Sequence, residues 1–272
     1  MSFLLVLLAL VTAALGALGG IGGAVILVPL LVLTGTPARE AAPLGLLSVA
    51  SGSLAAGPRQ LAELTVHHRI GVTTEVVASF GAVAGALLSG AVGEAALTRL
   101  LALVAVASAM ASLRGRDEVH AVAPDEEGAG DLGEQRGTLS GNLRSEGSVR
   151  RYEARHLPGA LAVVSLAGLV AGIAGVGGGF IKTPVTSEIM RVPVKVAAAT
   201  TTFTIGITSA TALLVFAAHG RVNLEHAGPV IAGSLFGGYI GARFQSSLDP
   251  SVIRRSLAAL LFVVAAILFV GA

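Results

Sequence analysis

Two glycine clusters, each set inside a long apolar stretch, are the residues of this chain whose spacing points most directly to chemistry. The first cluster is Gly20-Ile21-Gly22-Gly23, and the second is Gly175-Val176-Gly177-Gly178-Gly179. Glycine in a helix costs about 1 kcal/mol per residue relative to alanine, so each cluster predicts a helix break. A helix that restarts after a break exposes unpaired N–H groups and the positive end of its dipole, which together can bind an anion.

The backbone around these breaks supplies the candidate anion-binding positions. They are Gly20, Gly22, Gly23 and Ala24 at the first break and Gly175, Gly177, Gly178, Gly179 and Phe180 at the second. The alternative is that these glycines only allow close helix packing, which is what we expect of Gly81 with Gly85 and of Gly233, Gly237 and Gly241. With Gly19 included in the first cluster, each cluster has four glycines within five residues, which exceeds what packing needs, so we favour a binding break.

Lys182 lies well inside an apolar segment and Glu75 lies in another, and ionisable groups at such depth suggest function by default. Lys182 follows the second cluster and would supply a positive charge to an oxyanion; alternatively it snorkels to an interface or pairs with Glu188. Its counterpart in the first half is Leu27, so the two halves differ at this position. Glu75 is a candidate proton carrier, because a carboxylate at depth can titrate, or else it lies near the interface.

Hydroxyl side chains are concentrated in the apolar segment 196–218, with fewer in segment 41–57. The candidates for donating to an anion are Thr200, Thr201 and Thr204 from the first of these segments and Ser48 from the second. Membrane Ser and Thr often bond only to the backbone of their own helix, and this alternative stays open for each of them.

Residue types exclude several other classes of site. The chain has no cysteine, which removes disulfides, thiolate metal sites and cysteine nucleophiles. Its six histidines lie outside the apolar segments or at their ends, so we predict no metal site. No catalytic motif and no pair of carboxylates within a span is present, so we expect no enzyme and no cofactor. The pI is near 9.5, but no basic run with interleaved aromatics predicts nucleic-acid binding.

The elements that position these residues must be membrane helices. Charged residues are 12% of the chain, about half the usual share, and 54% of its residues are hydrophobic. Apolar stretches occupy residues 3–34, 41–57, 70–92, 95–113, 158–190, 196–218, 227–247 and 252–271. Crossing a bilayer takes about 20 helical residues, and continuous apolar runs do not fit a barrel. We therefore predict an all-α, multi-pass protein of the cell membrane with about eight transmembrane segments.

The sequence also repeats itself. Gly20 through Pro29 matches Gly175 through Pro184 at an offset of 155 residues. This predicts two homologous four-segment repeats with glycine-broken first helices, an N-terminal repeat at 1–113 and a C-terminal repeat at 158–272. Four crossings in each would make the repeats parallel, whereas a first segment that enters and returns would make them inverted. Residues 114–157 are polar and predict a flexible linker, because they cannot bury enough apolar surface to fold.

The paired motifs GGIGGAVILVP and GVGGGFIKTP, one in each half, resemble those of the TauE/SafE family of sulfite exporters and related permeases. The hydroxyl-rich segment 196–218 and the loop after it are similar to the same family. The resemblance implies transport of sulfite or small organosulfonates, usually outward from the cytoplasm. The first motif departs from the second at Ala24 and Leu27, where the second has Gly179 and Lys182, so an anion site would rest mostly on the second half.

These observations predict a membrane transporter, an exporter of sulfite or a related small sulfur-containing or organosulfonate anion. It would work by alternating access around the two glycine-broken helices. The alternatives are a passive anion channel and a non-transporting membrane scaffold or sensor. The expected partners are the small anion and the lipid bilayer, with no nucleic acid, and a homodimer is compatible with the sequence.

Overall fold

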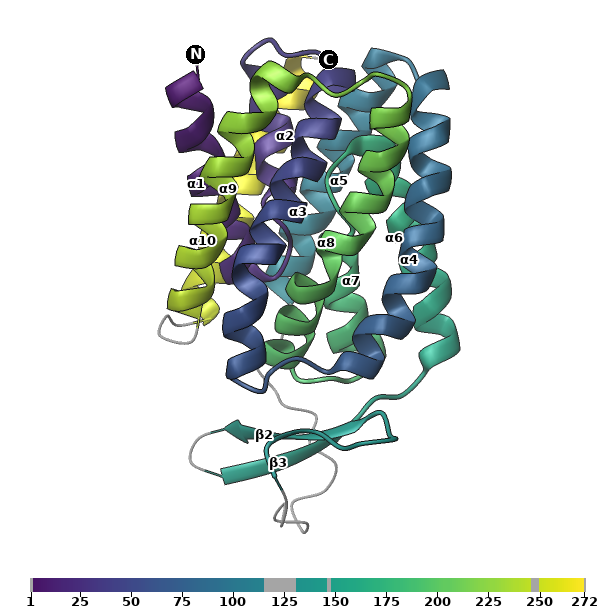
Figure 1. The fold of residues 1–272 in the computed structure, drawn as a ribbon, viewed down its shortest axis with the longest axis vertical. Helices are drawn as coiled ribbons and strands as arrows, with labels where there is room; N and C mark the ends of the chain where they lie inside the picture. Colours follow the sequence, from purple (N-terminus) through teal and green to yellow (C-terminus); the bar gives the residue numbers. More distant parts are fainter. Residues whose placement is uncertain (1, 115–130, 146–147, 246–249, 272) are drawn as a thin grey trace.

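The computed structural model describes residues 2–114, 131–145, 148–245 and 250–271, and these form a helical bundle with a small sheet at one end (Figure 1). The first half contains α1 (Ser2–Gly19), α2 (Ala24–Leu33), α3 (Ala38–Ala62), α4 (His68–Leu88), the 3-10 turn η1 (Ser89–Ala91) and α5 (Glu94–Arg114). The second half contains α6 (Leu157–Ala174), α7 (Gly179–Pro184), the π-helical turn η2 (Val185–Ile189), α8 (Val194–Ala218), α9 (Leu224–Gln245) and α10 (Pro250–Gly271). Strands β1 (Gly133–Glu134), β2 (Ser140–Ser145) and β3 (Ser148–Glu153) lie between the halves in the chain.

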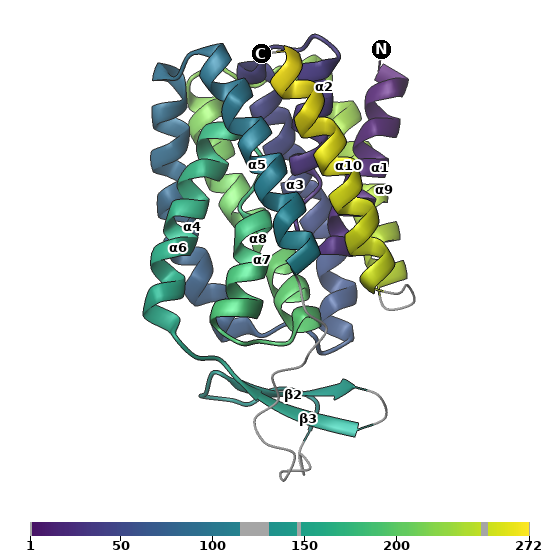
Figure 2. The same cartoon turned by 180° about the vertical axis from the view of Figure 1, so that it is seen from behind.

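The two glycine-broken segments form helical hairpins. α1 and α2 enter from and return to one end of the bundle, whereas α6 and α7 enter from and return to the end that carries the sheet (Figures 1 and 2). A Cβ added to Gly23 would lie 2.7 Å from the Cα of Ala13, so α2 folds back directly on α1. Eight full crossings are not confirmed, because each break reverses the chain within these two segments. The two hairpins therefore have opposite orientations, which matches the inverted alternative.

Length and hydropathy support a multi-pass membrane protein. Among the described residues, five helices are long and apolar enough to span a bilayer, namely α3, α4 with η1, α5, α6 and α8. Large apolar side chains lie on the outside of the bundle; Phe80 is 75% exposed, Leu214 70% and Phe236 65%. An aqueous protein rarely exposes apolar surface of this extent, and a bilayer covers it without cost.

Helices of one half pack on helices of the other. α1 lies along α9, α4 along α6, α3 along α8 and α5 along α10. A Cβ added to Gly81 or Gly85 would lie about 2 Å from a backbone carbonyl oxygen of α6. A Cβ added to Gly233, Gly237 or Gly241 would lie about as close to a backbone carbonyl oxygen of α1. These glycines therefore serve close packing, as expected. Two related units that each pack on the other would produce this pairing of helices. The repeat itself stays a prediction.

The sheet differs from the flexible linker expected at 114–157. β2 pairs antiparallel with both β1 and β3. The side chains of Leu143 and Tyr152 are buried in a cluster with Val164, Val185 and Met190 from the helices, and burial raises the pKa of the Tyr152 phenol. The prediction of a flexible linker is wrong for residues 131–145 and 148–153, because the strands use the end of the bundle as their second layer. Residues 115–130 lie outside the described residues.

Histidine contacts hold the sheet to the bundle. Glu134 of β1 lies with its carboxylate 3.2 Å from His67 Nδ1 and 3.3 Å from His68 Nδ1. It also accepts a 2.6 Å hydrogen bond from the N–H of His68. His67 is fully buried, and the edge of its ring faces Tyr152 with 6.0 Å between the ring centroids.

The docking of the sheet is expected to weaken in acid. Burial, partly offset by Glu134, lowers the pKa of His67 below its ordinary value of 6.5. The neutral imidazole is thus favoured in the folded protein, and the stability it contributes is present above pH 6.5 and is lost as the pH falls below it. Hydrogen exchange of the β2 and β3 amides should therefore accelerate between about pH 7 and about pH 5, after correction for intrinsic rates. The variant His67→Gln should flatten this dependence, and protection that stays constant in the wild type would contradict it.

Candidate functional site

Both breaks have the same backbone conformation. Gly20 and Gly22 have φ values of +66° and +82°, and Gly175 and Gly177 have +71° and +68°. L side chains rarely adopt this left-handed region, so glycine is required at the two positions of each break where the chain reverses. The helix breaks predicted from the glycine clusters are thus present at both sites.

The tips of the two hairpins meet near the middle of the bundle. The nearest side chains to both Gly22 and Gly177 are Val49 of α3 and Ile205 of α8, which lie halfway along their helices. A Cβ added to Gly179 would lie 2.7 Å from the carbonyl oxygen of Ile21, so the two breaks touch. The candidate backbone positions of both halves therefore gather at one depth.

Each hairpin presents the start of a short helix at this depth. The N–H groups of Ile26 and Leu27 bond to the carbonyl of Gly23, and those of Ile181 and Lys182 bond to the carbonyl of Gly178. The N–H groups that precede them at each helix start have no intrahelical acceptor, as at every helix N-terminus. Ala24 and Phe180, which belong to these first turns, are buried.

A cavity of about 20 Å³ lies beside the first break. It is lined by Ala13, Gly16, Ala17, Gly22, Gly23, Ser48, Val49, Gly52, Ser53, Thr202 and Ile205. This volume is enough for one water molecule. Ser48 accepts a 2.8 Å hydrogen bond from Ser234, while the buried hydroxyl of Thr202 has no hydrogen-bond partner among the described residues.

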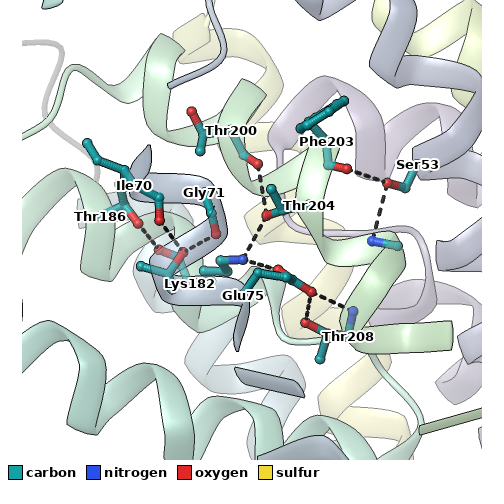
Figure 3. Close-up of polar contacts among 12 residues, drawn as sticks. Ser53, Ile70, Gly71, Glu75, Lys182, Thr186, Thr200, Phe203, Thr204 and Thr208 are labelled. Atoms are coloured by element: carbon teal, nitrogen blue, oxygen red, sulfur yellow. Dashed lines mark hydrogen bonds and ion pairs between the residues drawn. The ribbon is translucent and has the colours of Figure 1, made fainter. Parts of the chain in front are cut away.

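A buried ion pair lies beside the second break (Figure 3). Lys182 of α7 donates to Glu75 of α4, and it also donates to the hydroxyl of Thr204 across 2.7 Å. The other carboxylate oxygen of Glu75 accepts from both the N–H and the hydroxyl of Thr208. Lys182 is 1% exposed and Glu75 3% exposed, so the pair is shielded from solvent.

This pair rules out the alternatives that the sequence left open for the two ionisable residues. Lys182 neither snorkels nor pairs with Glu188, which is exposed; its charge is compensated by Glu75. Glu75 lies deep in the bundle and not near an interface. Sequence reasoning missed both the pairing and the role of Thr208, although Thr208 stands one helical turn after Thr204 on the same face.

The remaining candidate hydroxyls are dispersed around the site. Thr200 accepts a 2.9 Å hydrogen bond from the N–H of His67, and its carbonyl accepts from Thr204. Thr201 is buried, and its hydroxyl has no partner among the described residues. Ser53, which was not singled out from the sequence, donates to the carbonyl of Thr202 across 2.6 Å. Thus Ser48 lies at the cavity, Thr204 at the ion pair, and Thr200 nearer the sheet.

A family model described as "Sulfite exporter TauE/SafE" matches residues 5–268. The chain belongs to the TauE/SafE family. A "Probable membrane transporter protein YunE" of Bacillus subtilis (strain 168) is 31% identical to it over 93 residues, which cover 34% of this chain and 34% of that protein. The alignment thus spans about a third of the length of this relative. No solved structure matches the chain.

Membership of the TauE/SafE family, together with the long apolar helices, makes the chain a multi-pass membrane protein. This confirms the resemblance seen in the glycine motifs. The anion carried and the residues that bind it are the subject of the proposals below.

Proposed function

We propose that this TauE/SafE transporter exports sulfite or a related small sulfur oxyanion, such as an organosulfonate, across the cell membrane. The observation that carries the proposal is the meeting of two glycine breaks, from oppositely oriented hairpins, at the middle of the bundle. Each break directs the start of a helix to that point, and helix starts bind anions through N–H groups. The matching family model, named for sulfite export, supports the choice of anion.

The proposed binding groups combine backbone and hydroxyl donors. The N–H groups around Gly22, Gly23 and Ala24 and those around Gly177, Gly178 and Gly179 bind oxyanion oxygens. Ser48 and Thr204, each one residue from a side chain that contacts both breaks, add hydroxyls. Thr201 and Thr202 offer further hydroxyls whose oxygens have no partner among the described residues. The donors come from both halves, and sulfite or a sulfonate group has three oxygens that can accept from them.

The orientation of the hairpins supports alternating access. One hairpin reaches the centre from each end of the bundle, so movement of one hairpin and its neighbours against the other can open the site to either side in turn (Figures 1 and 2). The close glycine contacts between α1 and α9 and between α4 and α6 keep each hairpin attached to the opposite half. Each moving unit would then consist of one hairpin together with the helix of the opposite half on which it packs.

Flux of labelled sulfite from proteoliposomes tests the proposal. The wild type should give saturable flux that unlabelled methanesulfonate inhibits. Ser48→Ala should lower that flux about tenfold, since a hydrogen bond to a charged group contributes about 1.5–3 kcal/mol. Ser108→Ala is the matched control, because Ser108 is also buried but bonds only to the carbonyl of Val104 in its own helix.

Two results would contradict the proposal. Absence of flux with sulfite, sulfonates and thiosulfate alike would exclude this class of substrate. Non-saturating currents in electrical recordings would replace the carrier by a passive anion channel.

A further inference from the structure

The ion pair of Lys182 and Glu75 occupies the place that corresponds to the cavity in the other half. α3 and α8 are both 25 residues long, and Ser48 and Thr204 each stand at the eleventh position. Gly52 and Thr208 each stand at the fifteenth. In α3 these two positions line the cavity, whereas in α8 they bind the ion pair. The carboxylate of Glu75 therefore fills, next to α8, the place that is an open cavity next to α3.

The groups around this carboxylate form an oxyanion site. One oxygen of Glu75 accepts from the ammonium of Lys182, and the other accepts from the N–H and the hydroxyl of Thr208. A cation, a hydroxyl and a backbone N–H are the donors that proteins use for carboxylate, phosphate and sulfonate oxygens. Glu75 is thus bound as a ligand tethered to α4.

We infer that this is a proton-gated anion site, in which protonation of Glu75 releases its carboxylate and the anion takes its place on Lys182 and Thr208. The inference rests on the proposed function for the identity of the anion. The proton comes from water on the side to which the site is open, and it leaves with the anion on the other side. The anion and one proton therefore cross together.

Charge balance at this depth requires the proton. An uncompensated charge buried in a membrane protein costs several kcal/mol. Without the anion, Lys182 and ionised Glu75 sum to zero. A monovalent anion beside both would leave one negative charge in excess, whereas protonated Glu75 restores neutrality. Flux of a monovalent anion would then follow the combined proton and anion gradients and not the membrane potential.

No other described charge faces this site. α6, which packs on α4, contains no ionisable residue. The other ionisable side chains described on α4, α5, η2 and α8 are all exposed, namely His68, Arg69, Glu94, Arg99, Glu188 and Lys195. His67 at the start of α4 is buried, but it faces Glu134 and Tyr152 of the sheet. Glu75 is therefore the group whose protonation can balance the anion.

Binding of methanesulfonate to the purified full chain in detergent tests the inference, because this probe stays monovalent throughout the pH range used. When methanesulfonate is added in weak buffer, the wild type should take up about one proton for each anion bound. Its affinity for methanesulfonate should rise about tenfold for each unit by which the pH falls. Glu75→Gln, which cannot ionise, should bind at every pH without proton uptake. Glu188→Gln, the same substitution at an exposed carboxylate, should behave as wild type.

The outcomes separate the inference from the proposed function. Proton-free binding in the wild type, proton uptake that persists in Glu75→Gln, or no binding of methanesulfonate at any pH would each overturn the inference. Sulfite flux that does not depend on pH and is unchanged in Glu75→Gln would overturn the inference, but it would leave the proposal of sulfite transport standing. Proton-linked binding of methanesulfonate without any sulfite flux would support the proton-gated anion site and contradict the proposed transport function.

Discussion

Replacing Lys182 with methionine is expected to lower the free energy of unfolding by about 3–5 kcal/mol, because it leaves Glu75 as an unpaired buried carboxylate. Both partners are almost fully buried, so water cannot replace the lost contact. Unfolding of the purified protein in mixed detergent micelles, followed by circular dichroism, measures the change.

Two variants control this experiment. Lys182→Met combined with Glu75→Gln removes both charges and should recover most of the lost stability, since the two residues are in contact and their effects do not add. Lys195→Met makes the same change at an exposed position in the first turn of α8 and should stay within about 0.5 kcal/mol of wild type. A stable Lys182→Met single variant would show that the ion pair does not form.

Gly175→Ala is expected to be the most damaging of the conservative changes at the breaks. The residue has a φ of +71°, and its added Cβ would lie 2.2 Å from the Cα and 2.3 Å from the carbonyl oxygen of Ala42. Left-handed strain of about 1–2 kcal/mol and overpacking of about 1–3 kcal/mol together give a loss of roughly 2–5 kcal/mol. Because α3 must shift, transport should be lost as well. Mixed-micelle unfolding and sulfite flux measure the two effects.

Gly220 provides the matched control for backbone strain. Its φ is +65°, but no atom lies within 4 Å of an added Cβ. Gly220→Ala should therefore cost only the strain, about 1–2 kcal/mol, and should keep transport. Equal losses in the two variants would mean that the contact of Gly175 with Ala42 has no role.

Local features of the fold could be predicted from the sequence, because they depend on residues close together in the chain. Four glycines in five or six residues fix the positions of the breaks, and i, i+4 glycines fix the packing faces of α4 and α9. The direction of the chain after each break could not be predicted, since a glycine turn can bend a helix or reverse it. The sheet was missed because its second layer is the distant end of the bundle.

The partner of Lys182 could not be identified from local sequence. Glu75 lies 107 residues away, and only the packing of α4, α7 and α8 brings the two together. One signal was nevertheless present: Lys182 and Glu75 are both ionisable groups within apolar segments. Buried charges in membranes are usually paired, so each was the natural partner of the other.

Under the proposed function, the space at the first break also limits how fast the anion can bind. A cavity that holds one water molecule cannot admit sulfite or methanesulfonate, which have four or more heavy atoms. Helices around Ser48 and Thr202 must therefore separate before the anion can enter. The association rate would then level off as anion concentration rises, at the rate of this opening and far below the diffusion limit.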